Sequence, residues 1–189
     1  MKLVILDRDG TINADSDEFI KSPAEWTPLP GALEAIARLN HAGWHTVIAS
    51  NQSGLGRGLF DVASLNAVHA KMHKMLAAQG ARIDAVFYCP HSPDEGCHCR
   101  KPLPGLFEQI GERFGVDLKG TPVVGDGLRD LLAGTAVGCE PHLVLTGKVA
   151  AFRGKPLPEG FPAGTQVHED LAAFAEHLIA RSAGAKAAP

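Results

Sequence analysis

Val4-Ile5-Leu6-Asp7-Arg8-Asp9-Gly10-Thr11 joins a short apolar run to two acids, a glycine and a threonine. The apolar run over residues 2–6 is typical of a buried strand, and the polar residues mark its end. Side chains two positions apart on a strand point to the same side, so we expect the carboxylates of Asp7 and Asp9 to lie close together. Two such charges repel and need a shared proton or a cation, and Mg²⁺ is a hard cation that carboxylate oxygens bind.

Outward from this segment, the hydrophobic pattern alternates between strand and helix. We expect further strands over residues 44–49, 85–88, 122–124 and 142–146, and helices over 30–42, 62–78, 106–114, 128–137 and 170–181. Alternating strands and helices indicate an α/β fold with a three-layer arrangement, in which helices cover both faces of a parallel sheet.

Functional side chains in such sheets follow the carboxyl ends of the strands. Polar residues stand at four of these positions: 7–11, 50–54, 89–91 and 125–127. Asp126 follows the fourth expected strand and is placed to complete a magnesium site with the acids of the first. A carboxylate such as Asp7 can also act as a nucleophile and form an acyl phosphate.

The composition excludes several other classes of protein. The chain has 189 residues, 45% hydrophobic and 21% charged, which suits one globular domain. A net charge of −3 leaves no basic footprint for nucleic acid, and no apolar run approaches the ~20 residues that span a bilayer. The apolar run at the N-terminus is too short for the core of a secretion signal and lacks a small-residue cleavage site, so we expect no such signal. We therefore expect a cytoplasmic monomer that binds neither nucleic acid nor membrane.

A cluster of metal-type ligands follows the third expected strand. Cys-x-His and then Cys-x-Cys supply four ligands, enough for a closed tetrahedral zinc site. The four ligands are Cys89, His91, Cys97 and Cys99. With no open position, the Zn²⁺ is expected to be structural, and His98, between two ligands, is expected to face solvent. This zinc-binding loop, residues 89–99, runs directly into Arg100 and Lys101.

These motifs, in this order, resemble the haloacid dehalogenase (HAD) superfamily of phosphatases, which has a Rossmann-like fold. The resemblance implies that Asp7 attacks phosphorus, that Asp9 transfers protons, and that Ser50 and Lys101 hold the phosphoryl oxygens. It implies a Mg²⁺ ion held by Asp7, the backbone carbonyl of Asp9, and Asp126. Asp130 stays open between a part of the metal motif and an ordinary helix residue.

Within the superfamily, the cysteine pattern is similar to two families, the heptose-bisphosphate phosphatases and the histidinol-phosphate phosphatases. The segments 50–58 and 99–105 favour the heptose family, which implies removal of the 7-phosphate of a heptose 1,7-bisphosphate, a small sugar-phosphate substrate. The further residues that the resemblance assigns to substrate contact are Asp15, Ser16, Asp17, Glu18, Asn51, Gln52, Ser53 and Arg100. Histidinol phosphate is the alternative substrate, and a zinc-stabilised binding module without catalysis is the alternative from another class.

The chain length between motifs limits the domain organisation. The segments that separate Asp9, Ser50 and Lys101 are already occupied by expected elements, so no large cap domain fits. We expect one domain over residues 1–181 and a flexible tail over 182–189. On the helix over 62–78, His69 and His73 are expected to lie on the solvent face.

Overall fold

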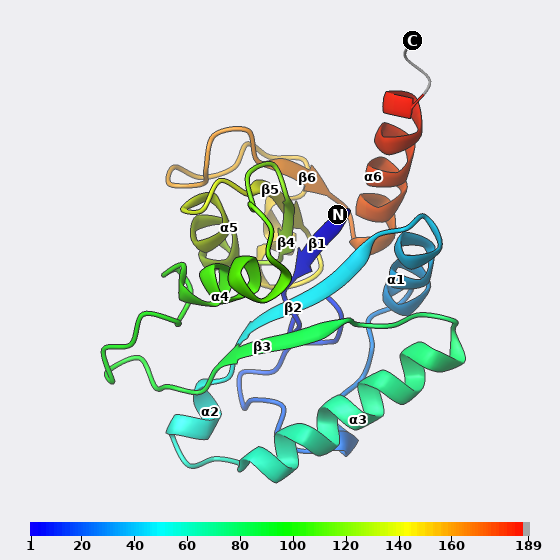
Figure 1. Cartoon of the computed structure of the whole chain (residues 1–189). Coiled ribbons are helices and arrows are strands. Elements are labelled where there is room, and N and C mark those ends of the chain that lie inside the picture. Colours follow the sequence, from blue (N-terminus) through cyan, green and yellow to red (C-terminus); the bar gives the residue numbers. More distant parts are fainter. Residues whose placement is uncertain (187–189) are drawn as a thin grey trace.

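Six parallel strands form one sheet in a computed structural model that describes residues 1–186 (Figure 1). The strand order is β3-β2-β1-β4-β5-β6. The strands are β1 (Leu3–Leu6), β2 (His45–Asn51), β3 (Ala85–Cys89), β4 (Pro122–Gly125), β5 (Glu140–Val144) and β6 (Gln166–His168). The expected parallel α/β sheet is confirmed.

Six α-helices and two short 3-10 turns connect the strands. They are α1 (Ala32–His41), α2 (Ser53–Gly56), α3 (Val62–Ala78), α4 (Gly105–Phe114), α5 (Leu128–Thr135), α6 (Leu171–Lys186), η1 (Pro23–Glu25) and η2 (Lys148–Phe152). Capping residues determine where some of these helices begin or end. The Asp61 side chain accepts from the Ser64 N–H at the start of α3, and Gly115 ends α4 at a φ of 63°.

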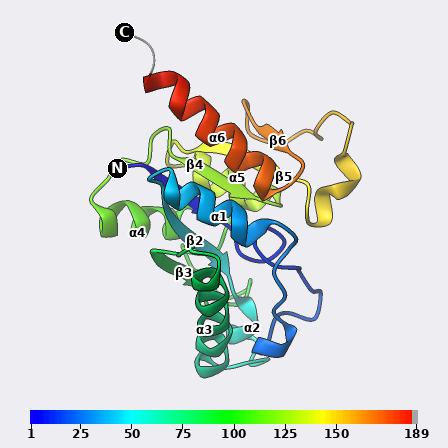
Figure 2. The ribbon, with the colours of Figure 1, turned by 90° about the vertical axis from the view of Figure 1, so that its right-hand side faces the viewer.

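Alternation along β1 divides the core into two layers. Val4 and Leu6 pack with residues of α1, α3 and α6 on one face of the sheet. Leu3 and Ile5 pack with residues of α4 and α5 on the other face (Figure 2). Burying each large side chain stabilises the fold by about 1.5–3 kcal/mol, so this central strand is held firmly from both sides. The expected three-layer arrangement is therefore confirmed, and no large cap domain interrupts the chain between residues 1 and 186.

The central position of β1 fixes where the polar strand ends meet. Its two neighbours are β2 and β4, and the chain proceeds outward from β1 in both directions. The carboxyl end of β1 is thus the switch point of the sheet, where a crevice forms in this class of fold. The Asp7 N–H donates to the Val124 carbonyl over 2.9 Å, which fixes the first acid against β4.

Several elements differ from the sequence-based expectations, and β5 runs over Glu140–Val144 where a strand over 142–146 was expected. The edge strand β6 was not expected, because three residues of period-two pattern give little signal and its central Val167 is exposed. β2 extends to Asn51, and residues 53–56 form α2. Residues 182–186 of the expected tail are helical, because α6 continues to Lys186 through alanine-rich sequence and Ser182 Oγ donates to the Leu178 carbonyl. Residues 187–189 of that tail lie outside the described residues. No helix within 1–186 is long and apolar enough to cross a membrane.

Candidate active site

Three carboxylates meet at the carboxyl ends of β1 and β4. Oxygen atoms of Asp7, Asp126 and Asp130 all lie within 4.8 Å of one another. Asp7 directly follows β1, Asp126 directly follows β4, and Asp130 lies in the first turn of α5. The sheet therefore brings together acids that are more than 100 residues apart in sequence.

Two glycines leave the space that the Asp126 carboxylate occupies. A Cβ atom on Gly10 or on Gly147 would overlap the Asp126 carboxylate. Gly10 also has a φ of 82°, a conformation that side chains with a Cβ rarely adopt. Gly10, the glycine of the opening motif, is thus required both by the close approach of the Asp126 carboxylate and by its own backbone conformation.

The electrostatics of this cluster fit a cation. Burial, then repulsion from Asp130, raises the pKa of Asp7 to about 7. Burial, then repulsion from Asp7, raises the pKa of Asp126 to about 9. These shifts describe an excess of negative charge, which a divalent cation would relieve. Carboxylate oxygens are the donor set that Mg²⁺ takes, so the residues present fit the expected ion.

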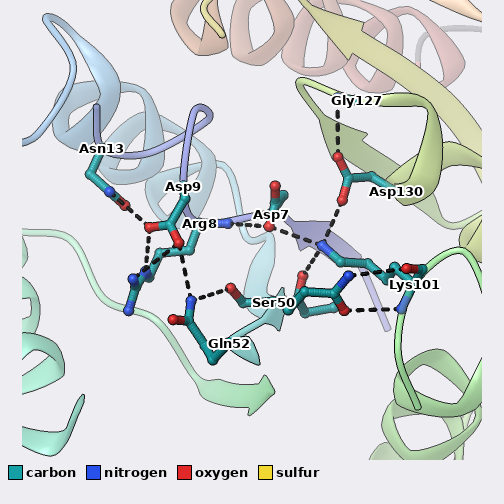
Figure 3. Close-up of polar contacts among 11 residues, drawn as sticks. Asp7, Arg8, Asp9, Asn13, Ser50, Gln52, Lys101, Gly127 and Asp130 are labelled. Carbon is teal, nitrogen blue, oxygen red and sulfur yellow. Dashed lines mark hydrogen bonds and ion pairs between the residues drawn. The ribbon is translucent and has the colours of Figure 1, made fainter. Parts of the chain in front are cut away.

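Lys101 supplies the one ammonium group inside the cluster among the described residues. It is 2% exposed, and Nζ donates to Asp7 Oδ1 over 2.9 Å, to Asp130 Oδ1 over 2.5 Å and to the Ala49 carbonyl over 2.7 Å (Figure 3). Burial opposes the charge of Lys101, but Asp130 and Asp7 raise its pKa above the ordinary value. Asp130 Oδ2 also accepts from the Gly127 N–H, so both of its oxygens are bonded within the protein.

The backbone of Lys101 is clamped as well. Asn51 Nδ2 donates to the Lys101 carbonyl over 3.0 Å, and the Lys101 N–H donates to Asn51 Oδ1 over 2.9 Å. This reciprocal pair ties the end of β2 to the start of the segment after the zinc-binding loop. The Asn51 side chain is engaged here, and its expected contact with substrate stays a prediction.

Asp9 does not join the Asp7 cluster through its side chain. Arg8 Nε and Nη2 donate to the two Asp9 oxygens over 2.8 and 3.1 Å, and Asn13 and Gln52 donate to the same carboxylate (Figure 3). Burial works against ionisation, but Arg8 and these hydrogen bonds hold the pKa of Asp9 below its ordinary value. The Asp9 carboxylate is outside the group of oxygens within 4.8 Å of one another, but it is near enough that its charge adds to the raised pKa of Asp7. The expected closeness of the two carboxylates stays a prediction.

Ser50 and Asp9 are linked through Gln52. Gln52 Nε2 donates to Ser50 Oγ over 2.7 Å and to Asp9 Oδ2 over 3.1 Å. Ser50 is fully buried at the end of β2, and Ser53 opens α2 beside it with 7% exposure. These residues lie at the site as expected, while their individual roles stay predictions.

The four expected zinc ligands converge. Ligand atoms of Cys89, His91, Cys97 and Cys99 lie within 4.8 Å of one another. Cys89 Sγ lies 3.6 Å from Cys97 Sγ, and His91 Nδ1 lies 3.2 Å from Cys99 Sγ. Such spacings suit sulfur and nitrogen at the corners of a tetrahedron around Zn²⁺. His98 stands outside this group and lies 2.9 Å from exposed Glu108, in agreement with the expected solvent position.

A basic group that the sequence analysis did not assign surrounds Arg100. Arg100 and Arg129 line a hollow of about 440 Å³ together with Lys101. Burial, then repulsion from Arg129, lowers the pKa of Arg100, and Arg57 adds to that repulsion. The Arg57 guanidinium lies 5.8 Å from the centre of the Phe19 ring. The three arginines come from the end of α2, the segment after the zinc-binding loop, and α5, so no local sequence signal reports that they lie near one another.

The expected substrate loop comes near Asp126, because the charge of Asp15 adds to the raised pKa of Asp126. Asp15, Ser16 and Asp17 line a hollow of about 380 Å³, together with Gly147 and Lys148. Glu18 does not line that hollow, and its carbonyl accepts from Lys21 Nζ. Lys148, which the sequence analysis did not assign, lies 2.9 Å from Asp17 in an exposed ion pair.

His69 contradicts the expectation of a solvent-facing helix surface. It is 8% exposed, and its Nε2 lies 3.1 Å from Arg8 Nη1. It follows Leu65 by four residues and precedes Met72 by three, so it falls on the buried stripe of α3. That spacing was the available signal. His73, one turn further on, is exposed as expected.

Comparisons with known proteins define the class first. The family model described as HAD-hydrolase-like matches residues 98–174, and the model described as polynucleotide kinase 3 phosphatase matches residues 2–128. These matches identify a HAD-type hydrolase, the class expected from the motifs.

Close relatives then define the family. A D-glycero-β-D-manno-heptose-1,7-bisphosphate 7-phosphatase of Bordetella bronchiseptica is 59% identical, over 95% of this chain and 98% of that protein. The crystal structure of a D,D-heptose 1,7-bisphosphate phosphatase from B. bronchiseptica, complexed with magnesium and phosphate, has a TM-score of 0.91 at 58% identity, covering 96% of this chain and 99% of that one. The corresponding protein of Burkholderia thailandensis has a TM-score of 0.73 at 52% identity, covering 95% and 99%. The chain belongs to the family of heptose-bisphosphate phosphatases, and it is a phosphoric monoester hydrolase.

Proposed function

We propose that this enzyme removes the 7-phosphate of D-glycero-β-D-manno-heptose 1,7-bisphosphate through an aspartyl-phosphate on Asp7. The observation that carries the proposal is that two acids at one strand end have different bonding partners. Asp7 lies among Lys101, Asp126 and Asp130, whereas Asp9 is held by Arg8, with no contact to that cluster through its carboxylate. One carboxylate is therefore free to attack phosphorus while the other handles protons.

The first step forms a covalent bond. An Asp7 carboxylate oxygen attacks phosphorus, the bond from phosphorus to O7 of the sugar breaks, and Asp9 gives a proton to the departing oxygen. Asp9 is ionised before substrate binds, and it takes up this proton because the charge of the bound phosphate raises its pKa. Lys101 and Ser50 hold the transferring phosphoryl oxygens, over which the charge of the loose transition state is spread.

The second step releases phosphate. Asp9, now a carboxylate, takes a proton from a water molecule, whose oxygen attacks phosphorus of the aspartyl-phosphate. The bond between phosphorus and the Asp7 oxygen breaks, so Asp7 returns to a carboxylate and inorganic phosphate leaves. Gln52 keeps Asp9 beside Ser50 in both steps, because it donates to each of them.

Two metal ions complete the proposal. Asp7, Asp126 and the backbone carbonyl of Asp9 would hold Mg²⁺, which, when bound, neutralises charge on the transferring phosphoryl group. Support comes from the excess negative charge of the cluster and from the B. bronchiseptica structure, which contains magnesium and phosphate. Cys89, His91, Cys97 and Cys99 would hold a structural Zn²⁺ that stiffens the segment leading to Arg100 and Lys101.

A second phosphate group on the substrate would explain the basic residues around the site. Arg100 and Arg129 line one hollow next to Lys101, and Arg57 lies close enough to lower the pKa of Arg100. Within residues 1–186, none of these three guanidinium groups forms an ion pair with a carboxylate. The three groups repel one another, and a bound anion would relieve that repulsion. We propose that the 1-phosphate of the substrate occupies this region while the 7-phosphate faces Asp7.

The decisive experiment is phosphate release in the presence of Mg²⁺ from the β and α anomers of heptose 1,7-bisphosphate and from histidinol phosphate. We expect the β anomer to be preferred and Asp7→Asn to reduce its turnover to the background. A preference for histidinol phosphate would overturn the heptose assignment, with acidic Asp15 then placed to pair with the substrate ammonium. Turnover by Asp7→Asn would overturn the covalent mechanism.

A further inference from the structure

Arg8 is a buried cation that the proposed reaction does not use directly. It is fully buried, and its guanidinium forms a fork on Asp9 through Nε and Nη2. Its Nη1 lies 3.1 Å from His69 Nε2 on α3. The guanidinium is therefore fixed at two sides, by the carboxylate of the neighbouring residue and by an imidazole 61 positions away.

The direction of the second contact follows from chemistry. A guanidinium has only donors, so Arg8 Nη1 donates and His69 Nε2 accepts. His69 must then be neutral, with its proton on Nδ1. Burial, then the positive charge of Arg8, lowers the pKa of His69 to about 4, which agrees with a neutral ring.

We propose that His69 is a positioning residue for Asp9 and acts through Arg8. The long helix α3 carries His69 on its buried stripe, between Leu65 and Met72, so its ring is packed in place. His69 binds Nη1, the guanidinium nitrogen that does not donate to Asp9. It thereby sets the plane in which Arg8 holds both Asp9 oxygens. Asp9 is thereby oriented toward the leaving oxygen of the substrate. This inference rests on the proposed role of Asp9 as proton donor.

The test compares two side chains of equal length. His69→Gln retains an acceptor that can occupy the place of Nε2, whereas His69→Met has a similar shape and no strong acceptor. His73→Gln is the control, because His73 is exposed one turn away on the same helix. Each protein is assayed with heptose 1,7-bisphosphate, whose alkoxide leaving group needs a proton, and with p-nitrophenyl phosphate, whose phenolate does not. First-turnover rates are measured with excess enzyme, at a temperature where circular dichroism shows all variants folded.

For His69→Met we expect the first-turnover rate with the heptose substrate to fall about tenfold, a part of what general acid catalysis supplies. Release of p-nitrophenolate should stay within about twofold of the wild-type rate, and KM for the heptose substrate should be unchanged. His69→Gln should recover most of the loss, and His73→Gln should equal the wild type. A merely structural role of His69 would slow both substrates alike.

Asp9→Asn separates this inference from the proposed function. The proposed function predicts that Asp9→Asn slows the heptose substrate more than p-nitrophenyl phosphate. If it does, equal losses on both substrates in His69→Met, or no recovery in His69→Gln, would overturn the positioning role of His69 alone. If Asp9→Asn itself slows both substrates equally, the proton-donor role of Asp9 falls, and the role of His69 falls with it.

Discussion

Lys101 Nζ lies 2.5 Å from Asp130 Oδ1, and this ion pair joins the segment after the zinc-binding loop to the first turn of α5. Asp130 thereby has a defined part in the site. With one oxygen on Lys101 and the other on the Gly127 N–H, it holds the ammonium beside Asp7 and fixes the turn that carries Asp126. The question that the motif left open is answered by these contacts.

Removal of the buried ammonium should cost both stability and activity. In Lys101→Met, three clustered carboxylates lose their cationic partner, and unfolding free energy in magnesium-free buffer should fall by about 3 kcal/mol. Phosphate release should fall at least about 100-fold, as for loss of an electrostatic stabiliser. Urea denaturation and a phosphate assay measure the two effects, with Lys119→Met as an exposed-lysine control. Near-normal stability of Lys101→Met would contradict the importance of this ammonium.

The cysteine cluster should couple zinc content to stability. We expect Cys97→Ser to lose its zinc and to melt more than about 5 °C below the wild type, because structural zinc contributes folding free energy. Cys139→Ala is the control, since Cys139 is a buried cysteine that is not among the four converging ligands. Elemental analysis and thermal melting give the two readouts. Zinc loss with an unchanged melting temperature would refute a structural ion.

Arg129 should distinguish a bisphosphate from a monophosphate. Arg129→Met should raise KM for heptose 1,7-bisphosphate about tenfold, because one charge-assisted contact to the second phosphate is lost. Hydrolysis of p-nitrophenyl phosphate, which has no second phosphate, should change less than about twofold. Arg113→Met removes an equal charge from the exposed side of α4 and should alter neither value. A parallel rise in KM for both substrates would argue against a separate subsite.

A histidine group far from the carboxylates should make stability sensitive to acid. His142 is fully buried beside His168, with Glu140, His177 and Arg181 also near it. Burial first, and repulsion from a neighbouring histidine second, lowers the pKa of His142 and of His168 from 6.5 to about 4 each. A lowered histidine pKa stabilises the fold above pH 6.5 and loses that contribution as pH falls toward 4, because the unfolded chain takes up protons first.

The measurement is urea denaturation at pH 7 and pH 5. The wild type should lose about 2 kcal/mol from these histidines over this range, with His168 contributing less because it is only half-buried. A variant with both His142→Leu and His168→Leu should lose correspondingly less, even if it starts from a lower stability. If the free energy of unfolding of both proteins changed equally between pH 7 and pH 5, this explanation would be wrong.

The limits of sequence reasoning are visible at single residues. The zinc ligands could be predicted because they lie close together in sequence and their element types are diagnostic. Arg57 and Arg129 could not, since each comes from a different element and neither has a local pattern that reports its neighbours. His69 was misplaced because its residue type outweighed its position on the buried stripe of α3.

Short-range spacing and residue type were enough to predict β1 to β5 and the longer helices, the acids that follow β1 and β4, the zinc ligands and the class of chemistry. The pairing of side chains could be seen only in the folded structure. There Asp9 bonds to Arg8, Asp130 bonds to Lys101 and His69 contacts Arg8. Such pairings depend on where strands end and how helices pack across the sheet, and the free energy of those contacts is set by residues far apart in the chain.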